Sequence, residues 1–307
     1  MKVLFICSGN SKDRINPVVK IQGDTLRQNG IDVEYFTIKG NGIRGYIKNI
    51  YILRQYLKNK YYDIVHAHYS LSGMVASLAG SRPLVVSLMG SDVRLNFFLK
   101  IIFNMFKKLY WRNVIVKSEY LKKKSKIRNA KVIPNGVELD RFKKVNKKIA
   151  QEKIGFDPNK KHIVFVANPD RSEKNFILAK EAFSLLDEKE VELNVVFDVP
   201  YEKIPYYLYA ADVLLLTSLW EGSPNVVKEA MVCGLPIVST DVGDVRKLIG
   251  KTEGCYITSF EPEDVKKKIE KSLEFGKRTK GIKNISHLDS NKIAQDIIEI
   301  YHQVIKN

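Results

Sequence analysis

The chain has 307 residues, of which 45% are hydrophobic and 28% are charged. This composition indicates a globular protein of about two domains and excludes a disordered chain, a collagen-like repeat and a small disulfide scaffold. Residues 1–150 hold 29 Lys and Arg against 9 Asp and Glu, a net +20, whereas residues 151–307 hold 22 against 25, a net −3. The basic half is therefore expected to meet nucleic acid, an anionic membrane or an anionic substrate, unless the charge serves solubility alone.

Strand and helix signals alternate along the first half. Asn16 followed by Pro17 is typical of a helix start, and that helix is expected to end at Gly30. The other predicted elements are strands at Lys2–Cys7, Ile31–Thr37, Asp63–Ala67, Pro83–Leu88 and Val114–Val116, and helices at Arg44–Asn59, from Ala67 to about Gly80, and at Leu95–Trp111. Such alternation predicts a parallel, doubly wound sheet.

The alternation of strand and helix signals stops in the polar segment Arg141–Lys161, where we expect a linker, and resumes after it. The later elements are strands at His162–Ala167, Val191–Phe197, Asp212–Thr217 and Pro236–Thr240, and helices at Asn175–Leu186, Pro224–Val232, Pro262–Phe275 and Ser290–Ile305. The prediction is an α/β protein with two Rossmann-like domains facing a cleft. The domains are residues 1–143 and 144–289, with the helix of residues 290–307 packing back onto the first. Ligands of such sheets bind at the carboxyl ends of the strands.

The cysteines and the apolar runs bear on the compartment. Cys7, Cys233 and Cys255 include no CxxC pair, which favours a reducing compartment over a disulfide framework or a zinc ribbon. The run Val3–Cys7 is too short for a signal-peptide core, and the longest stretch without charged residues, Ile64–Ser81, is too polar to span a membrane. We expect a cytoplasmic protein, either soluble or peripheral.

The most informative segment follows the predicted strand Asp212–Thr217. Ser223 is a good N-cap and Pro224 a good first helical residue, so the free N–H groups of the helix start are expected to form an anion site. Glu221 precedes this turn and Glu229 lies on the helix. An anion site between two carboxylates suits a nucleotide sugar. The alternative is a surface capping turn, with Glu229 paired to a lysine such as Lys228.

The segment EGSPNVVKEAMVCGLPIVSTDVGD, residues 221–244, resembles the donor-site signature of retaining family 4 glycosyltransferases, which adopt the GT-B fold. The resemblance implies that Glu229 binds ribose hydroxyls, that Glu221 lies near the donor sugar, and that the backbone of Gly222, Ser223, Pro224 and Asn225 contacts sugar and phosphate. PNGVELDRF, residues 134–142, and IVFVANPDRSEKNF, residues 163–176, resemble further family segments. The second implies that Lys174 and Arg171 contact the donor diphosphate.

Segments of the first domain resemble parts of the family that line the cleft. Gly9 and Asn10 follow the first strand, where the family places a small-residue loop near the diphosphate or acceptor. His68 and Asp92 stand in IVHAHYSLSG and SLMGSDVR, which resemble segments near the sugar, whereas His66 is expected to face inward. Met89 stands where many relatives have a histidine.

The resemblance implies a hexosyltransferase that moves a sugar from a nucleotide diphosphate sugar to an acceptor hydroxyl with retention, in surface-polysaccharide synthesis. No metal motif is seen near the donor segment, so we expect no metal and no other cofactor. The general base is left unassigned. One alternative is a nucleotide-sugar 2-epimerase of the same fold, and another is a non-catalytic basic protein that binds nucleic acid or membrane.

The segment Arg94–Arg112 has five basic residues, no acids and five Phe or Trp. Such a helix suits an anionic membrane surface, but its aromatic stripe could equally pack on the sheet. A lipid-linked acceptor would explain the +20 of the first half. We therefore expect the partners to be a nucleotide sugar, a glycan or lipid-linked acceptor and the inner face of the cell membrane, and no nucleic acid.

Overall fold

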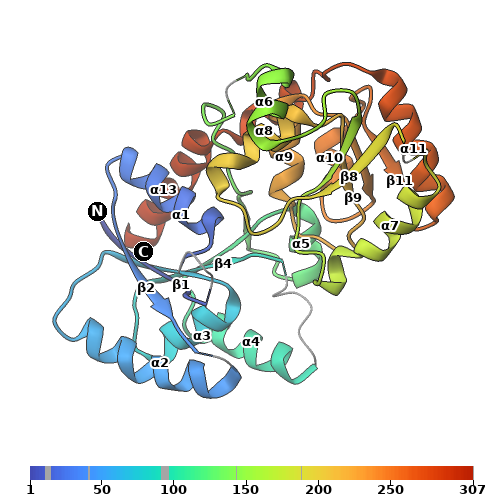
Figure 1. Cartoon of the computed structure of the whole chain (residues 1–307). Helices are drawn as coiled ribbons and strands as arrows, with labels where there is room; N and C mark the ends of the chain where they lie inside the picture. The colour runs from blue at the N-terminus through green and yellow to red at the C-terminus, as the bar shows by residue number, and fades with distance from the viewer. Residues whose placement is uncertain (11–14, 41, 91–96, 143, 188, 307) are drawn as a thin grey trace. The chain divides into compact units, whose positions relative to one another are not determined.

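A computed structural model of the chain describes residues 1–10, 15–40, 42–90, 97–142, 144–187 and 189–306 (Figure 1). It contains two compact units. The first unit comprises Met1–Gly136 together with Ser290–Asn307, and the second comprises Val137–Asp289.

The first unit is built on a six-stranded parallel sheet. Its strand order is β2 (Asp32–Ile38), β1 (Lys2–Ser8), β3 (Ile64–His68), β4 (Leu84–Leu88), β5 (Asn113–Val116) and β6 (Lys131–Val132). The order reverses between β1 and β3, so the two chain segments that follow these strands diverge to opposite faces. A ligand site of a doubly wound sheet lies at such a switch point, at the carboxyl ends of the strands.

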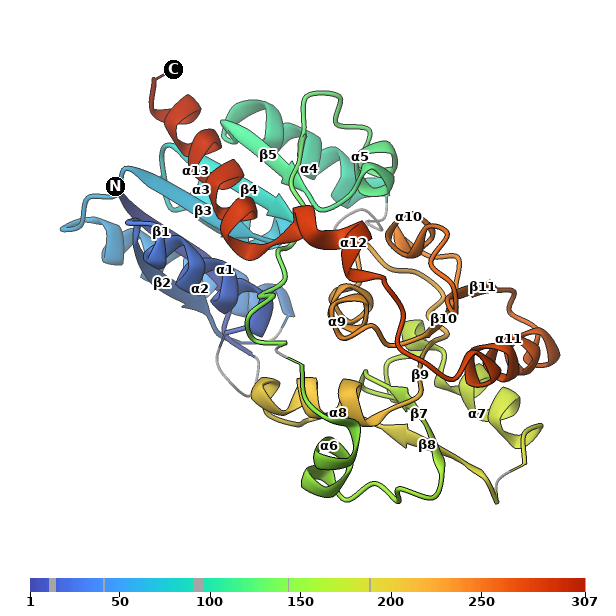
Figure 2. The same ribbon diagram turned by 90° about the horizontal axis from the view of Figure 1, so that it is seen from above.

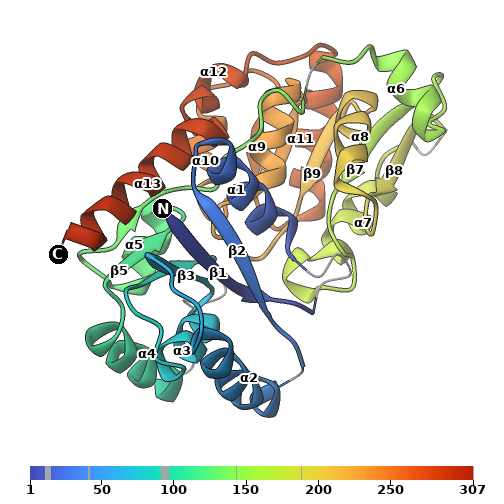
Figure 3. The same cartoon turned by 90° about the vertical axis from the view of Figure 1, so that its left-hand side faces the viewer.

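Helices cover both faces of this sheet. One face carries α1 (Pro17–Gln28) and α13 (Ser290–Lys306), and the other carries α2 (Gly42–Leu57), α3 (Ser70–Leu78) and α4 (Phe97–Leu109), as Figure 3 shows. The short helix α5 (Glu119–Ser125) follows β5. Helix α13, the last of the chain, contacts α1 and so completes the first unit.

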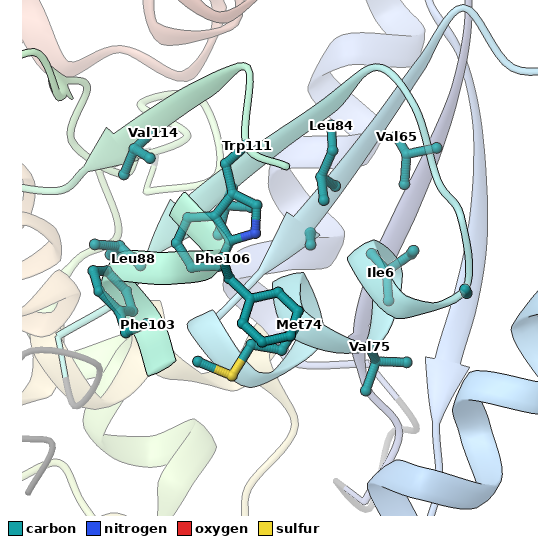
Figure 4. Packing of buried hydrophobic residues seen from close by; sticks show 14 of the residues in the cluster. Ile6, Val65, Met74, Val75, Leu84, Leu88, Phe103, Phe106, Trp111 and Val114 are labelled. Carbon is teal, nitrogen blue, oxygen red and sulfur yellow. The ribbon is translucent and has the colours of Figure 1, made fainter. Parts of the chain in front are cut away.

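The core under α2, α3 and α4 is aromatic and aliphatic. Phe103 and Trp111 meet edge to face with ring centroids 5.1 Å apart, and Phe106 and Met74 lie in the same cluster (Figure 4). The aromatic side chains of this segment that the structure describes are therefore packed against the sheet, as one of the two alternatives for Arg94–Arg112 required. Edge-to-face aromatic pairs add stabilisation beyond their buried area.

The second unit has a five-stranded parallel sheet of the same winding. Its order is β11 (Tyr256–Thr258), β10 (Ile237–Thr240), β9 (Val213–Leu216), β7 (Lys161–Phe165) and β8 (Val191–Val195). Helices α7 (Phe176–Ser184) and α11 (Pro262–Phe275) pack together on one face, and α6 (Lys147–Ile154), α8 (Ile204–Ala210) and α9 (Asn225–Cys233) follow the other (Figure 2). The short helices α10 (Val245–Ile249) and α12 (Ile282–Ile285) contact α9.

The predicted fold class is confirmed, since both units are parallel, doubly wound α/β sheets. Several local predictions were wrong. The segment expected to be a linker, Arg141–Lys161, contains helix α6, and the sequence pattern missed two short strands and four further short helices. These missed elements are β6, β11, α5, α8, α10 and α12.

Arg278 ties the end of α8 to the segment after α11. Its guanidinium donates to the carbonyl oxygens of Leu208 at 2.9 Å, Ala211 at 3.1 Å and Tyr209. Burial lowers the pKa of this guanidinium. Arg278→Met is expected to lower the free energy of unfolding by about 2 to 4 kcal/mol, because it leaves buried carbonyl groups without donors. Urea unfolding followed by circular dichroism measures the change.

The matched control is Arg246→Met. Arg246 also bonds a neighbour, Asp241, at 2.8 Å, but both side chains are more than half exposed. An exposed ion pair contributes about 0 to 1 kcal/mol, so this variant should unfold close to the wild type. If both variants lost the same free energy of unfolding, the hydrogen bonds from Arg278 to these carbonyl oxygens would not be what stabilises the unit.

Candidate functional site

The candidate site lies at the switch point of the second sheet. The order of strands reverses between β7 and β9, which are neighbours although β8 separates them in sequence. The turn after β7 carries Arg171 and Lys174, and the loop after β9 carries Glu221 and Gly222. The topology therefore brings together two of the segments that the sequence singled out separately.

Lys174 and Glu221 form an ion pair at this point. Lys174 Nζ lies 2.6 Å from Glu221 Oε1, and the Ser218 hydroxyl donates to the same oxygen at 2.8 Å. Both charged side chains are mostly buried, at 17% and 13% exposure. A lysine held in this way keeps its charge in a fixed position with little water around it, which strengthens its action on a nearby anion.

Backbone and side-chain bonds fix the two loops to each other. The Thr217 hydroxyl donates to the carbonyl oxygens of Lys174 and Asn175, and the Leu219 N–H donates to Glu173 O at 2.9 Å. Gly243, at φ +59°, lies so close to the loop that a Cβ there would be 2.9 Å from Gly222 O. The loop around Glu221 is therefore held by the segments after β7 and β10.

Arg171 takes a different arrangement from Lys174. Its guanidinium pairs with Glu173 in the same turn, and 56% of its side chain is exposed. The structure thus places both predicted diphosphate contacts in one turn, but only Lys174 bonds to Glu221.

Glu229 lies on α9, one turn after its first residue, and is buried. Tyr201, in the 3₁₀ turn Tyr201–Lys203 after β8, donates its hydroxyl to Glu229 Oε1 at 2.8 Å. Burial raises the pKa of the Glu229 carboxyl to about 7, although the Tyr201 hydrogen bond and the charge of Lys228 act to lower it. A carboxyl with this pKa changes its charge close to neutral pH.

The start of α9 differs from the prediction. The helix begins at Asn225 with Pro224 as its N-cap, and the Pro224 side chain makes no capping hydrogen bond. Ser223, expected to be the cap, instead donates its hydroxyl to Asp244 Oδ2 at 2.8 Å. The correction has a tertiary cause, since Asp244 comes from the loop after β10. The helix ends at Gly234 in the left-handed conformation, as predicted.

Lys228 and Asp244 add buried charge beside Glu229. Burial lowers the pKa of the Lys228 ammonium to about 8 and raises the pKa of the Asp244 carboxyl, while attraction between the two groups opposes both shifts. Burying charged groups of both signs is costly unless they are paired, and such clusters are common at functional sites.

Tyr201 and Arg141 are the residues of this site that the sequence did not reveal. The Arg141 guanidinium lies over the Tyr201 ring, 5.3 Å from its centroid, and bonds Glu138 at 2.6 Å. Arg141 and Glu138 belong to PNGVELDRF, so this segment meets the donor motif through Tyr201. A tyrosine in the short turn after β8 carries no signal of such a contact, because its partner is 28 residues away in sequence.

In the first unit, Gly9 and Asn10 follow β1 at the switch point, as expected. Gly9 allows a close approach, because a Cβ there would be 2.7 Å from Thr37 Cβ. The Asn10 side chain bonds Gly40 in both directions, with its amide donating to Gly40 O at 3.0 Å and its oxygen accepting from Gly40 N at 3.1 Å. The loop after β1 is thereby tied to the loop after β2.

His68 is not in a loop, contrary to expectation. It is the last residue of β3, is fully buried and stacks on His66 at a centroid distance of 4.5 Å. His66 bonds Tyr301 and Ser87, whereas neither ring nitrogen of His68 has a hydrogen-bond partner within the described part of the chain. Burial lowers the pKa of both imidazoles well below the usual range, so both are neutral. Asp92 lies outside the described residues.

The described ranges hold neither a metal-binding cluster nor a membrane-spanning helix. No three His, Cys, Asp or Glu side chains within them group closely enough to hold a metal ion. No helix there combines the length and the hydropathy needed to span a bilayer.

Both units match glycosyltransferase families. The model "Glycosyltransferase Family 4" matches residues 2–141, and "Glycosyl transferases group 1" matches residues 190–287. The chain is 30% identical over 227 residues to TuaC of Bacillus subtilis, which is named for teichuronic acid biosynthesis. It is 28% identical over 242 residues to an Escherichia coli UDP-Gal:alpha-D-GlcNAc-diphosphoundecaprenol alpha-1,3-galactosyltransferase. These matches cover 65% and 64% of this chain, and 58% and 62% of those proteins.

Solved structures confirm the fold over the whole chain. Anabaena HepE, solved with UDP and glucose, matches at a TM-score of 0.78 with 18% identity, covering 98% of this chain and 99% of that one. Sucrose-phosphate synthase of Thermosynechococcus elongatus matches at 0.79 with 16% identity, covering all of both chains. Both units are thus similar to glycosyltransferase domains, and the chain has the GT-B fold predicted from the sequence.

Proposed function

We propose that this chain is a glycosyltransferase that moves a sugar from a nucleoside diphosphate sugar to an acceptor hydroxyl, with retention of configuration. The observation that carries the proposal is the Lys174–Glu221 pair at the switch point of the second sheet. This ion pair lies at the loop that leads into α9, and α9 carries Glu229 on its second turn. A fixed cation, a helix start and two carboxylates suit a diphosphate joined to a ribose and a sugar.

The proposed reaction breaks the bond between the sugar C1 and the diphosphate oxygen and forms a bond from C1 to the acceptor oxygen. Lys174, Arg171 and the N-terminus of α9 would stabilise the negative charge that develops on the leaving diphosphate. The acceptor proton would pass to an oxygen of that diphosphate, so that both exchanges occur on one face of the sugar. No metal ion or other cofactor is part of the proposal.

The two glutamates would have different tasks. Glu221, fixed by Lys174 and Ser218, would accept hydrogen bonds from the donor sugar, with the backbone of residues 222–225 beside it. Glu229, fixed by Tyr201, would accept from the ribose hydroxyls. A carboxylate is a strong acceptor for such hydroxyls in a site with little water.

The first unit would bind the acceptor at the end of β1, where Gly9 and Asn10 lie, with Asp92 as a further candidate, whereas the buried His68 would lie beneath this surface rather than in contact with the acceptor. We propose a lipid-linked or surface glycan as the acceptor. The names of the relatives support this class, since one concerns teichuronic acid and another a diphosphoundecaprenol-linked sugar. The proposed place of action is the inner face of the cell membrane, with no nucleic-acid partner.

A thermal-shift screen with UDP-, GDP- and dTDP-sugars tests the donor site. A ligand that binds only the folded chain raises the melting temperature by mass action. We expect one nucleotide family to stabilise the wild type but not Glu229→Ala. The control is Glu181→Ala, which removes an exposed glutamate of α7 in the same unit and should leave the shift unchanged.

Two results would count against the proposal. No shift with any nucleotide sugar would leave the chain without a donor, and equal shifts in wild type and Glu229→Ala would move the donor away from α9. Transfer is separated from epimerisation by the products. A transferase releases free nucleoside diphosphate as the acceptor is consumed, whereas a 2-epimerase would convert the donor without any acceptor.

A further inference from the structure

The outward faces of α2 and α4 differ from an ordinary solvated surface. On α4, Ile101, Met105 and Leu109 stand at intervals of four residues, and each is between 49% and 60% exposed. On α2, Ile47 and Tyr51 repeat the same interval at 60% and 67%. Side chains four apart lie on one line of a helix, so each helix presents an apolar stripe to solvent.

The aromatic residues of α4 do not explain this stripe. Phe103 and Phe106 face the sheet with Trp111, as Figure 4 shows, and are buried. The helix therefore has two apolar faces, an aromatic one that holds it on the sheet and an aliphatic one that the first unit leaves uncovered. Helices α2, α3 and α4 form one layer on one side of the sheet (Figures 1 and 3). The stripes of α2 and α4 are exposed, so both lie on the outer side of this layer.

The charged residues of α2 and α4 themselves are all positive. Residues 42–62 and 97–112 contain nine Lys and Arg and no Asp or Glu. Lys60 is paired with Glu34 of β2, whereas Arg44, Lys48 and Lys108 are exposed on the helices themselves. Exposed aliphatic side chains between basic residues are the pattern of a helix that lies in the headgroup region of an anionic bilayer.

A basic hollow lies at the C-terminal end of α4. It has a volume of about 600 Å³ and is lined by three basic residues, three asparagines and two apolar residues, which are Lys107, Lys108, Arg112, Asn104, Asn113, Asn129, Trp111 and Val114. None of the described residues that line it is acidic. Ammonium, guanidinium and amide donors around one space suit the phosphate of a lipid headgroup.

We propose that the outer face of α2 and α4 docks on an anionic bilayer, with a headgroup phosphate in the hollow beside Lys107 and Lys108. A second copy of this chain is a poor occupant, because it would bring the same positive charge to the contact. Nucleic acid would pair with the charges but would gain nothing from the aliphatic stripe. This inference rests on the proposed function, because it names the membrane as the partner of the proposed enzyme. The docking surface and the donor site can each be rejected without the other.

Co-sedimentation with vesicles tests the proposal, using phosphatidylcholine alone and phosphatidylcholine mixed with phosphatidylglycerol. The wild type should bind the mixed vesicles at least tenfold more tightly than vesicles of phosphatidylcholine alone. The triple variant Ile101→Ser, Met105→Ser, Leu109→Ser should lose more than tenfold, because it removes the buried apolar area. Lys107→Ser with Lys108→Ser should lose roughly tenfold or more on mixed vesicles only, since each basic residue near an anionic surface contributes about fivefold.

Matched controls remove the same residue types elsewhere. Ile149→Ser with Ile305→Ser removes two exposed isoleucines, at 59% and 48% exposure, from the second unit and from α13 on the opposite face of the first sheet. Lys148→Ser with Lys283→Ser removes two exposed lysines of the second unit. Both controls should bind mixed vesicles like the wild type.

Several outcomes would overturn the docking surface. These are no vesicle binding by the wild type, equal loss in the control variants, a thermal shift with inorganic phosphate but no vesicle binding, or preference for duplex DNA over vesicles. Each variant is also screened with nucleotide sugars. In the wild type, a thermal shift with a nucleotide sugar but no vesicle binding would reject the docking surface alone, and vesicle binding without any such shift would reject the donor site alone. In the surface variants, the thermal shift should be retained while vesicle binding is lost.

Discussion

Replacing Lys174 by methionine is expected to lower kcat by about a hundred- to a thousandfold, the usual loss when one fixed donor to a developing negative charge is removed. Lys174 is mostly buried and held 2.6 Å from Glu221, so its ammonium needs no rearrangement as charge builds on the diphosphate. Methionine keeps the length of the side chain but not the charge. Release of nucleoside diphosphate from the donor that gives the largest thermal shift measures the effect.

The control for this variant is Lys180→Met, an exposed lysine on α7 a short distance along the same chain segment. It should retain wild-type kcat. A second comparison is Arg171→Met, whose side chain is more exposed and paired with Glu173, and a smaller loss is expected. If Lys174→Met kept its kcat and changed only the KM, the lysine would bind the donor equally in the ground and transition states, and its catalytic role would be rejected.

The sequence allowed the fold and the donor segment to be predicted because their signals are local. Alternating strand and helix patterns give parallel sheets, and the 221–244 segment contains its strand, turn and helix within a few tens of residues. The pairing of Lys174 with Glu221 then follows from topology, since both loops leave adjacent strands at the same edge.

The errors share a physical cause, which is that tertiary contacts overrode local preference. Ser223 has the side chain of a good N-cap, but its hydroxyl donates a hydrogen bond to Asp244 instead of capping α9. The predicted exposure of His68 relied on its position at the end of a strand, yet β3 is covered on both faces and all five of its residues are buried. Helix α6 was missed because its sequence is strongly polar, with few apolar residues to mark a buried face.

The Glu229 site was predicted only in part, because it too depends on tertiary contacts. The carboxylate could be predicted from its motif, but neither its burial nor Tyr201 could be, because no pattern within α9 indicates what covers it. The hydrogen bond from Tyr201 depends on the short turn after β8, and the charges that act on Glu229 from another loop are those of Arg141 and Glu138. A single sequence contains no local record of such contacts.

Donor affinity should fall about tenfold as pH decreases from above 8 to below 6, with a midpoint near the Glu229 pKa of about 7. Above the midpoint the carboxylate accepts strong hydrogen bonds from ribose, and below it the neutral acid accepts weaker ones. Glu229→Gln is neutral at every pH, so its affinity should stay low and flat. Isothermal titration with an intact nucleotide sugar measures this, because its diester phosphates do not titrate in the range.

Tyr201→Phe tests the direction in which the pKa of Glu229 shifts when its hydrogen-bond donor is removed. The tyrosine hydroxyl bonds the charged form of Glu229 and so lowers its pKa, in opposition to burial. Removing that hydroxyl should raise the pKa and move the affinity midpoint to a higher pH, while phenylalanine keeps the ring beneath Arg141. A purely structural tyrosine would change affinity equally at all pH values. A nucleotide sugar without the ribose 2′-hydroxyl should show a smaller pH dependence in the wild type, and an unchanged one would separate Glu229 from that hydroxyl.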